Sequence, residues 1–169
     1  MKIFSKQKNS RMCMICGLDN EYGVNAPFYN MEDGSVMTVF RYKEQHQSYP
    51  GRVHGGMITA MLDEMGLRSL WAKELSEETF GVTISLDTKY RKPVPYETEL
   101  IGRGVVVKNT SHFIITDSYI MDKDGEILAN GRIKYIKMDT QKIQEGVEVH
   151  EEMPYLVEDG RTEIEGPFF

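Results

Sequence analysis

The sequence predicts an α+β domain in which an antiparallel sheet of about six strands wraps around one long central helix. Three observations lead to this fold class: one long helical pattern, two strand-like segments before it and four after it. A chain of 169 residues has the length of one domain with its own apolar core. Because one face of the sheet must be buried, the helix is the element that covers it.

Two strands are predicted first, at residues 23–30 and 35–43, joined by a turn at Asp33-Gly34. Pro50-Gly51 then predicts a stretch without regular structure. The helix is predicted over 57–73, which holds strong helix formers and no proline. Apolar residues lie on a helical stripe (Ile58, Met61, Leu62, Met65) and also beside it, which predicts a helix buried on most sides.

Four further segments have the composition of strands, and the separators between them are short enough to join antiparallel neighbours. These segments are residues 80–91, 97–108, 112–121 and 126–137. A meandering sheet around a single central helix is the hot-dog architecture.

The ends of the chain are predicted to lie outside this domain, which spans residues 21–138. Residues 1–20 have little periodicity and are predicted to form a loose leader. Residues 139–169 hold nine acidic and two basic side chains and are predicted to form an extended acidic tail. Residues 1–138 carry a net charge of +1, although the whole chain carries −6, so this part of the chain can bind an anionic ligand.

Composition excludes several classes of function. No apolar run is long enough to cross a bilayer and no signal peptide is recognised, so a cytoplasmic protein without a membrane partner is expected. The sequence motifs of serine hydrolases, P-loop enzymes and zincins are absent. Nucleic-acid binding is not predicted either, because the sequence has no basic patch interleaved with aromatic residues. Cys13 and Cys16 are the only cysteines, so the four-ligand frame of structural zinc is missing and two reduced thiols in a loop are expected.

The sequence His54-Gly55-Gly56 at the helix start is the first candidate for chemistry. Glycines let a ligand approach the main chain, and N–H groups at the positive end of a helix dipole suit an oxyanion. One well-placed donor of this kind typically lowers the activation barrier of such a reaction by about 2.7–4 kcal/mol. The same glycines also suit a tight turn required for helix packing.

Asp63 is the second candidate, because burying an acid within an apolar helix costs free energy unless the acid has a hydrogen-bonding or charged partner or a functional role. Glu64 points about 100° away from it on the helix. Asp63 lies eight residues after Gly55, or about 12 Å along an ideal helix, so one carbonyl cannot contact both groups of one chain. One carbonyl could lie between Gly55 of one subunit and Asp63 of another if the helices run antiparallel across a twofold axis, which would imply a homodimer.

Two longer stretches carry a family resemblance: PGRVHGGMITAMLDEMG at residues 50–66 and VTISLDTKYRKPVP at 82–95. With CMICGLDNEYGVNAPF at the N-terminus, they resemble the acyl-CoA thioesterase branch of the hot-dog superfamily that includes the phenylacetate-pathway enzymes. The resemblance covers roughly residues 13–137. It implies hydrolysis of an acyl-CoA thioester by a homodimer or tetramer, with no cofactor because coenzyme A is part of the substrate.

The resemblance also implies roles for individual residues. Asp63 corresponds to the general base or nucleophile of the family. Thr83 corresponds to a hydroxyl that positions this carboxylate or the attacking water. The alternative for Thr83 is that threonine is simply a common residue in strands. His54 is expected to shape the turn and contact the thioester rather than act as the base. Ser48 stands where some relatives have an asparagine that orients the water, which leaves that role open.

Arg91 and Lys92 are candidates to bind the phosphates of coenzyme A, with Lys108 and Arg103 as weaker ones. Met57 is a candidate for the acyl pocket, although methionines there also suit core or dimer packing. Two alternatives stay open: an acyl-CoA sensor without catalysis on the same fold, and a hot-dog hydratase or dehydratase, which would depend on a histidine paired with an acid.

Overall fold

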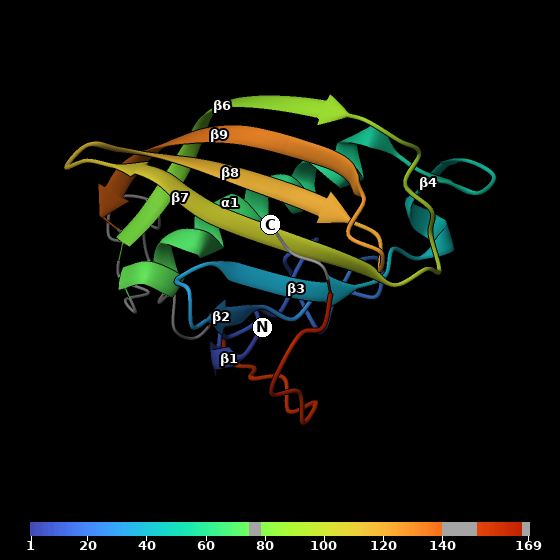
Figure 1. Cartoon of the computed structure of the whole chain (residues 1–169), viewed down its shortest axis with the longest axis horizontal. Helices are drawn as coiled ribbons and strands as arrows, with labels where there is room; N and C mark the ends of the chain where they lie inside the picture. The colour runs from blue at the N-terminus through green and yellow to red at the C-terminus, as the bar shows by residue number, and fades with distance from the viewer. Residues whose placement is uncertain (75–78, 140–151, 167–169) are drawn as a thin grey trace.

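The computed structural model describes residues 1–74, 79–139 and 152–166. In these ranges a seven-stranded antiparallel sheet curves around the long helix α1 (Gly55–Glu74), as Figure 1 shows. The strands follow the order β1-β2-β3-β7-β8-β9-β6 across the sheet. They are β1 (Ile3–Lys6), β2 (Tyr29–Met31), β3 (Val36–Phe40), β6 (Thr79–Tyr90), β7 (Leu100–Asn109), β8 (Phe113–Met121) and β9 (Ile127–Asp139). The predicted hot-dog fold is confirmed, with one strand more than the six expected.

Helix α1 is buried on most sides, as predicted. The stripe residues Met61, Leu62 and Met65 are fully buried and Ile58 is 4% exposed. Their burial stabilises the fold by roughly 1.5–3 kcal/mol per side chain. The helix lies so close to β7 that a Cβ atom at Gly104 would be 2.5 Å from the main-chain oxygen of Met65. The sheet face and the helix therefore form one core, and the position of α1 on the sheet is fixed by glycine.

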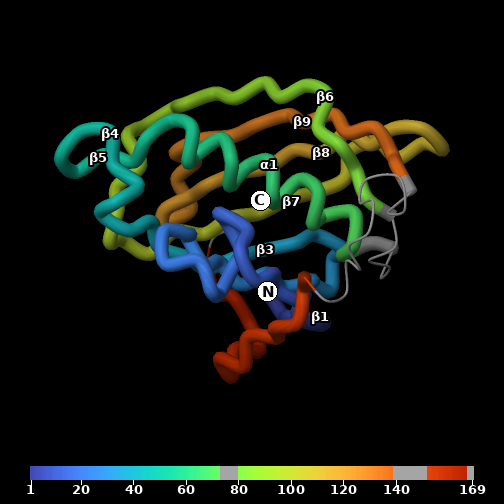
Figure 2. The backbone as a smooth tube through the Cα atoms, turned by 180° about the vertical axis from the view of Figure 1, so that it is seen from behind, coloured from blue at the N-terminus to red at the C-terminus, as the bar shows by residue number. Residues whose placement is uncertain are grey.

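The prediction of a loose leader at residues 1–20 is wrong. Residues 3–6 form β1, which pairs with β2, and Gln7 and Asn9 are buried. Figure 2 shows this N-terminal segment on the same side of the sheet as α1. Its polar side chains find partners there: the Gln7 Nε2 donates to the main-chain oxygen of Arg68 at 2.9 Å. Because such pairing depends on distant residues, no local periodicity marks this strand.

Two other segments differ from the prediction. The strand expected at 23–30 is found only at 29–31, because Pro27 lacks an N–H and Asn25 has a positive φ of 58°. The stretch around Pro50-Gly51 is regular: β4 (Gln47–Tyr49) and β5 (Arg52–Val53) form a small hairpin after the 3₁₀ turn η1 (Glu44–His46). Pro50-Gly51 forms its turn, in which Gly51 has a φ of 78° that L-residues rarely adopt.

The described part of the acidic tail, residues 152–166, packs against the N-terminal segment. Asp159 accepts hydrogen bonds from Lys6 Nζ at 2.7 Å and from the Tyr29 hydroxyl. Burial opposes ionisation of Asp159, but these donors outweigh it and lower its pKa to about 2. Ile164 is buried beside Tyr29 in a small apolar cluster. The two ends of the chain thus hold each other, while residues 140–151 and 167–169 of the predicted tail lie outside the described residues.

Candidate functional site

His54 and the two glycines that follow form the start of α1. The imidazole Nδ1 of His54 accepts the Gly56 N–H at 2.9 Å, and the His54 main-chain oxygen accepts the Met57 N–H at 3.0 Å. The His54 N–H donates to His46 O at 2.8 Å, which fixes the turn. The glycine pair predicted unpaired main-chain N–H groups at this helix start, but the Gly56 N–H is capped by His54. In the part of the chain that the structure describes, the Gly55 N–H has no acceptor and is the amide available to a ligand.

Asp63 lies on the face of α1 that turns toward β6. The Thr83 hydroxyl on β6 donates to Asp63 Oδ1 at 2.8 Å. Burial raises the pKa of Asp63 above its ordinary value, and the hydrogen bond from Thr83 acts in the opposite direction. The Tyr135 hydroxyl holds the Asp63 main-chain oxygen at 2.7 Å, which fixes this turn of the helix on the sheet. The site thus contains a carboxylate that accepts protons more readily than an exposed aspartate.

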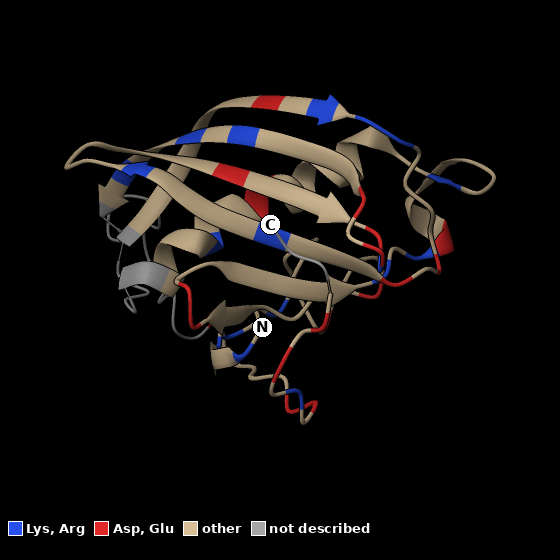
Figure 3. Ribbon diagram, viewed as in Figure 1, with Lys and Arg blue, Asp and Glu red and all other residues tan. Residues whose placement is uncertain are grey.

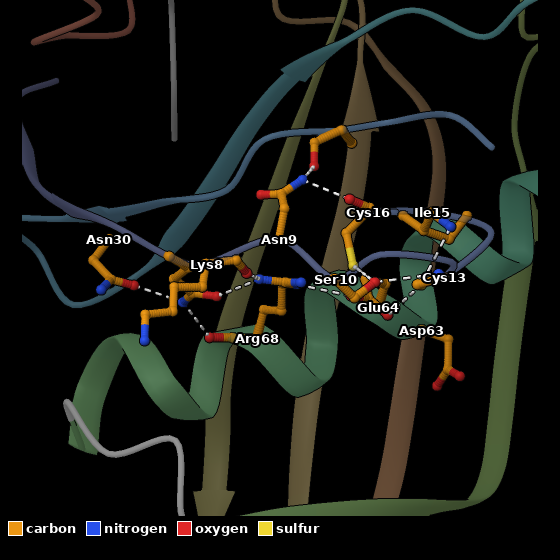
Figure 4. A network of polar contacts seen from close by, with 12 residues as sticks. Lys8, Asn9, Ser10, Cys13, Ile15, Cys16, Asn30, Asp63, Glu64 and Arg68 are labelled. Carbon is orange, nitrogen blue, oxygen red and sulfur yellow. Dashed lines mark hydrogen bonds and ion pairs between the residues drawn. The ribbon is translucent and has the colours of Figure 1, made fainter. Parts of the chain in front are cut away.

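Glu64 faces another part of the molecule, as its position on the helix predicts. Its carboxylate pairs with Arg68 at 2.8 Å, one helical turn further on. In Figure 4 the Asp63 side chain points away from the group around Glu64 and Arg68. The two neighbouring acids therefore have separate surroundings, and only Asp63 contacts Thr83.

Tyr90 and Thr59 complete the site and were not predicted from the sequence. The Tyr90 hydroxyl donates to the Gly55 main-chain oxygen at 3.1 Å and lies 2.7 Å from the Thr59 hydroxyl. Tyr90 is 56% exposed, so its ring borders the open side of the helix start. A tyrosine at the end of a strand, directly before Arg91-Lys92, was the available signal. Its apolar body and polar tip suit a rim of this kind.

A pocket of about 330 Å³ brings Gly55 together with Tyr90, Arg91 and Lys92. Figure 3 shows basic residues along the end of β6 and the loop that follows it. Both cations have partners: Arg91 Nε donates to Asn130 Oδ1 at 2.6 Å, and Lys92 pairs with Glu126. Lys92 and Glu126 are each about half exposed, and exposed pairs contribute roughly 0–1 kcal/mol, so a phosphate can compete for the lysine.

The other predicted binding residues are not brought to this pocket. Lys108 lies near the end of β7, with its Nζ 5.5 Å from the Phe113 ring, and the turn from β7 into β8 is at the opposite end of the sheet from β4 (Figure 1). Arg103 pairs with Asp33 at 2.8 Å. Ser48 is exposed on β4, outside the residues that line this pocket. Met57 packs against the main core.

The described residues thus combine a hot-dog fold with a half-buried acid on its central helix and an available amide at the helix start. The model of the Thioesterase superfamily matches residues 50–129. This part of the chain, which contains Gly55, Asp63 and Thr83, is similar to that superfamily. In the described residues no helix is long and apolar enough to span a membrane.

Individual proteins that the chain resembles are acyl-coenzyme A thioesterases. The acyl-coenzyme A thioesterase THEM4 of Rattus norvegicus is 26% identical over 127 residues, which are 75% of this chain and 52% of that protein. The chain thus spans about half the length of this relative. Acyl-coenzyme A thioesterase 13 of Homo sapiens is 23% identical over 100 residues, 59% of this chain and 70% of that protein.

Solved structures show the same fold. A thioesterase superfamily protein superposes with a TM-score of 0.66 and 26% identity, over 74% of this chain and 63% of that one. A phenylacetic acid degradation-related protein from Ralstonia eutropha has a TM-score of 0.59 at 19% identity, over 67% and 85% of the two chains. The latter likeness concerns the fold alone, and the phenylacetate-pathway branch stays a prediction.

Proposed function

We propose that this protein hydrolyses the thioester of an acyl-coenzyme A to a free acid and coenzyme A. The observation that carries the proposal is the Asp63 carboxylate, half-buried on α1 and held by Thr83 at 2.8 Å. An acid with a raised pKa and a fixed orientation suits a general base. The available Gly55 amide at the start of the same helix supports acyl transfer, because it can donate to a developing oxyanion.

The proposed reaction needs no other group. Asp63 accepts a proton from water while the water oxygen forms a bond to the thioester carbonyl carbon. The negative charge that develops on the carbonyl oxygen is stabilised by the Gly55 N–H at the positive end of α1. The C–S bond then breaks, coenzyme A leaves as a thiolate, and the acyl group leaves as a carboxylic acid. Direct attack by the Asp63 carboxylate, through an anhydride that water then hydrolyses, is the second route.

We propose a homodimer as the smallest active unit, with a dimer of dimers as the larger alternative. Gly55 and Asp63 are eight residues apart on one helix, about 12 Å along an ideal helix axis, so a single chain cannot present both to one carbonyl. The free edge strand β6 carries the exposed apolar residues Val82, Ile84 and Tyr90, which suit a contact with a second chain. A twofold axis there would place Asp63 of one chain near Gly55 of the other.

Mixing two inactive variants is expected to restore activity if the site is shared between chains. Asp63→Asn removes the base, and Gly55→Val covers the amide, because its side chain would extend from a Cβ position 3.4 Å from the Tyr90 hydroxyl. After refolding in equal amounts, half of the dimers are mixed and each contains one intact site. Thiol release should reach about a quarter of the wild-type rate. If both groups act within one chain, the mixture stays inactive.

Replacing Thr83 by valine is expected to move the acid limb of the pH–rate profile to higher pH. The carboxylate is active when ionised, so kcat/KM falls as the pH drops through its pKa. Burial raises the pKa of Asp63 and the Thr83 hydrogen bond lowers it, so removing that bond raises the pKa further. Ser85→Ala, which removes an exposed hydroxyl from the same strand, serves as the control. An unchanged acid limb in Thr83→Val would mean that Asp63 is not the base.

Arg91 and Lys92 are proposed to bind the phosphates of coenzyme A at the mouth of the 330 Å³ pocket. Replacing either one by alanine is expected to raise KM for acyl-CoA by about two- to fivefold, the factor for an exposed charge pair. The same substitutions should leave KM unchanged for an acyl-pantetheine, which lacks the nucleotide phosphates. Lys108→Ala, at the far end of the sheet, is the control. Equal effects on both substrates would contradict phosphate binding.

Release of free thiol from short, long and aromatic acyl-CoAs tests the proposed activity directly. Turnover of any of them establishes the thioesterase and its acyl preference. Tight binding without turnover would favour the acyl-CoA sensor instead. A hydratase or dehydratase would convert enoyl- or hydroxyacyl-CoA without releasing thiol, and His54→Gln would then lower its activity more than Asp63→Asn does.

A further inference from the structure

Two cysteines of the N-terminal segment meet an acid of the central helix. Among the described residues, the Sγ atoms of Cys13 and Cys16 and a carboxylate oxygen of Glu64 all lie within 4.8 Å of one another. Figure 4 shows the three side chains converging beside α1, with Asp63 pointing elsewhere. Both cysteines have free thiols, and Cys16 is buried. The proposed hydrolysis uses none of these three groups.

The turn that carries the cysteines holds both sulfurs on one side. The Gly17 N–H donates to Cys13 O at 2.9 Å, and the Ile15 N–H donates to Cys13 Sγ at 3.3 Å. The Ser10 hydroxyl lies 3.2 Å from Cys16 Sγ. A Cβ atom at Gly17 would be 2.5 Å from the Cys13 main chain, so only glycine fits after the second cysteine. A main-chain N–H is therefore directed at one sulfur and a hydroxyl lies beside the other, so both sulfurs have polar neighbours on the same side of the turn.

Arg68 orients Glu64 toward the sulfurs. The Arg68 Nε donates to Glu64 Oε1 at 2.8 Å, while Glu64 Oε2 lies 3.9 Å from Cys13 Sγ. The Arg68 side chain is itself buried, and its Nη1 is held by Gln7 Oε1 at 3.1 Å and by Lys8 O at 3.0 Å. One carboxylate oxygen is thus occupied by a fixed cation and the other is directed at the two thiols. Carboxylates that bind metal ions commonly have their second oxygen hydrogen-bonded in this way.

We infer that Cys13, Cys16 and Glu64 bind a zinc-like divalent ion, with water as the fourth ligand. Ligands at about 2.3 Å for sulfur and 2.0–2.2 Å for oxygen lie roughly 3.3–3.8 Å apart in a tetrahedron, so the cluster needs only a small contraction. Two thiolates and the carboxylate balance the charges of the ion and Arg68. The two thiol protons pass to solvent on binding.

This site revises the expectation that no metal is bound, which rested on counting cysteines. The third ligand comes from α1, 51 residues after Cys13, so no local spacing could reveal it. The ion would attach the N-terminal segment to the helix one residue from Asp63. Softness of the donor set favours zinc over magnesium or calcium, which prefer oxygen ligands.

Cobalt titration of the reduced, metal-free full-length protein tests the inference. One equivalent of Co²⁺ per chain is expected to produce the sulfur-to-cobalt charge-transfer absorption of thiolate ligation and the intense visible bands of tetrahedral cobalt. One equivalent of Zn²⁺ should then abolish both. Cys13→Ser and Cys16→Ser should each lose most of the charge-transfer absorption, and Glu64→Gln should weaken cobalt binding at least tenfold. Asp63→Asn removes the neighbouring acid as a matched control and should bind like wild type.

Three results would overturn the metal site. Wild type could show no charge-transfer absorption, the absorption could survive in both cysteine variants, or Asp63→Asn could lose cobalt as Glu64→Gln does. Because Glu64 also pairs with Arg68, the circular dichroism of Glu64→Gln is compared with wild type, and Glu64→Asp is measured as a variant that keeps the charge. If Glu64 binds the ion directly, Glu64→Asp should bind cobalt no more tightly than the cysteine variants do, because the shorter aspartate side chain cannot reach the ion.

Discussion

Asp63→Asn is expected to lower kcat for acyl-CoA hydrolysis by about 10²–10⁴, the usual contribution of a positioned general base. The amide keeps the shape of the carboxylate and can still accept the Thr83 hydrogen bond that Asp63 Oδ1 receives at 2.8 Å. It cannot take the proton from water. Release of coenzyme A thiol under saturating substrate measures the effect.

The fold of this variant is expected to remain intact, which separates lost chemistry from lost structure. Burial raises the pKa of Asp63, so its ionised form is disfavoured in the folded protein relative to the unfolded chain. The carboxyl group therefore contributes less to stability as the pH rises through its ordinary value toward the raised pKa. A neutral asparagine removes that cost at neutral pH. Asp87→Asn, an exposed acid on β6, is the control and should keep wild-type kcat. Equal losses in the two variants would contradict the role of Asp63.

Arg68→Met is expected to lower the free energy of unfolding by about 3–5 kcal/mol, the cost of removing one partner of a buried ion pair. Its side chain is 1% exposed and joins α1 to the N-terminal segment. The guanidinium lies 4.4 Å from the centre of the Phe28 ring, and it satisfies Glu64, Gln7 and Lys8. Methionine fills much of the volume but leaves these acceptors without a donor. Urea unfolding of wild type and variant gives the difference.

Arg132→Met is the matched control for this measurement. Arg132 also forms a two-bond pair with an acid, Asp117, at 2.7 Å for each bond, but its side chain is 62% exposed. Water replaces the lost bonds there, so only a slight change in the unfolding free energy is expected. A similar loss in both variants would mean that the Arg68 network contributes no more than an exposed ion pair.

The helix and the four strands after it could be predicted because their signals are local. Helical and strand periodicities appear in consecutive residues, and short turn sequences separate the strands. The observed bounds differ from the predicted ones by three residues or fewer. By contrast, β1 has only four residues and pairs with β2, and the Ile3 N–H also donates to the main-chain oxygen of Thr162, so its sequence IFSK carries no distinctive local pattern. The β4–β5 hairpin was missed because Pro50-Gly51 was interpreted as a break in regular structure when it forms a turn.

The candidate site was predictable to the extent that its residues lie on one helix and the strand after it. The sequence contains an acid, two glycines and a threonine at spacings like those of the thioesterase family it resembles, and the contact between Asp63 and Thr83 is present. It could not show that His54 Nδ1 accepts the hydrogen bond from the Gly56 N–H, because that bond depends on the rotamer of the histidine side chain. Nor could it place Tyr90 at Gly55, since the two residues are 35 positions apart.

The sequence by itself determined the fold class, the position of the central helix and the pair of elements that carry the site, because each follows from periodicity within a few turns or strands. Only the tertiary structure decided how the ends of the chain pack. It placed Lys6 against Asp159 across 153 positions and Cys13 against Glu64 across 51. Such contacts depend on where the sheet and helix bring distant segments together, and pairings of this kind leave no mark in the local order of residues.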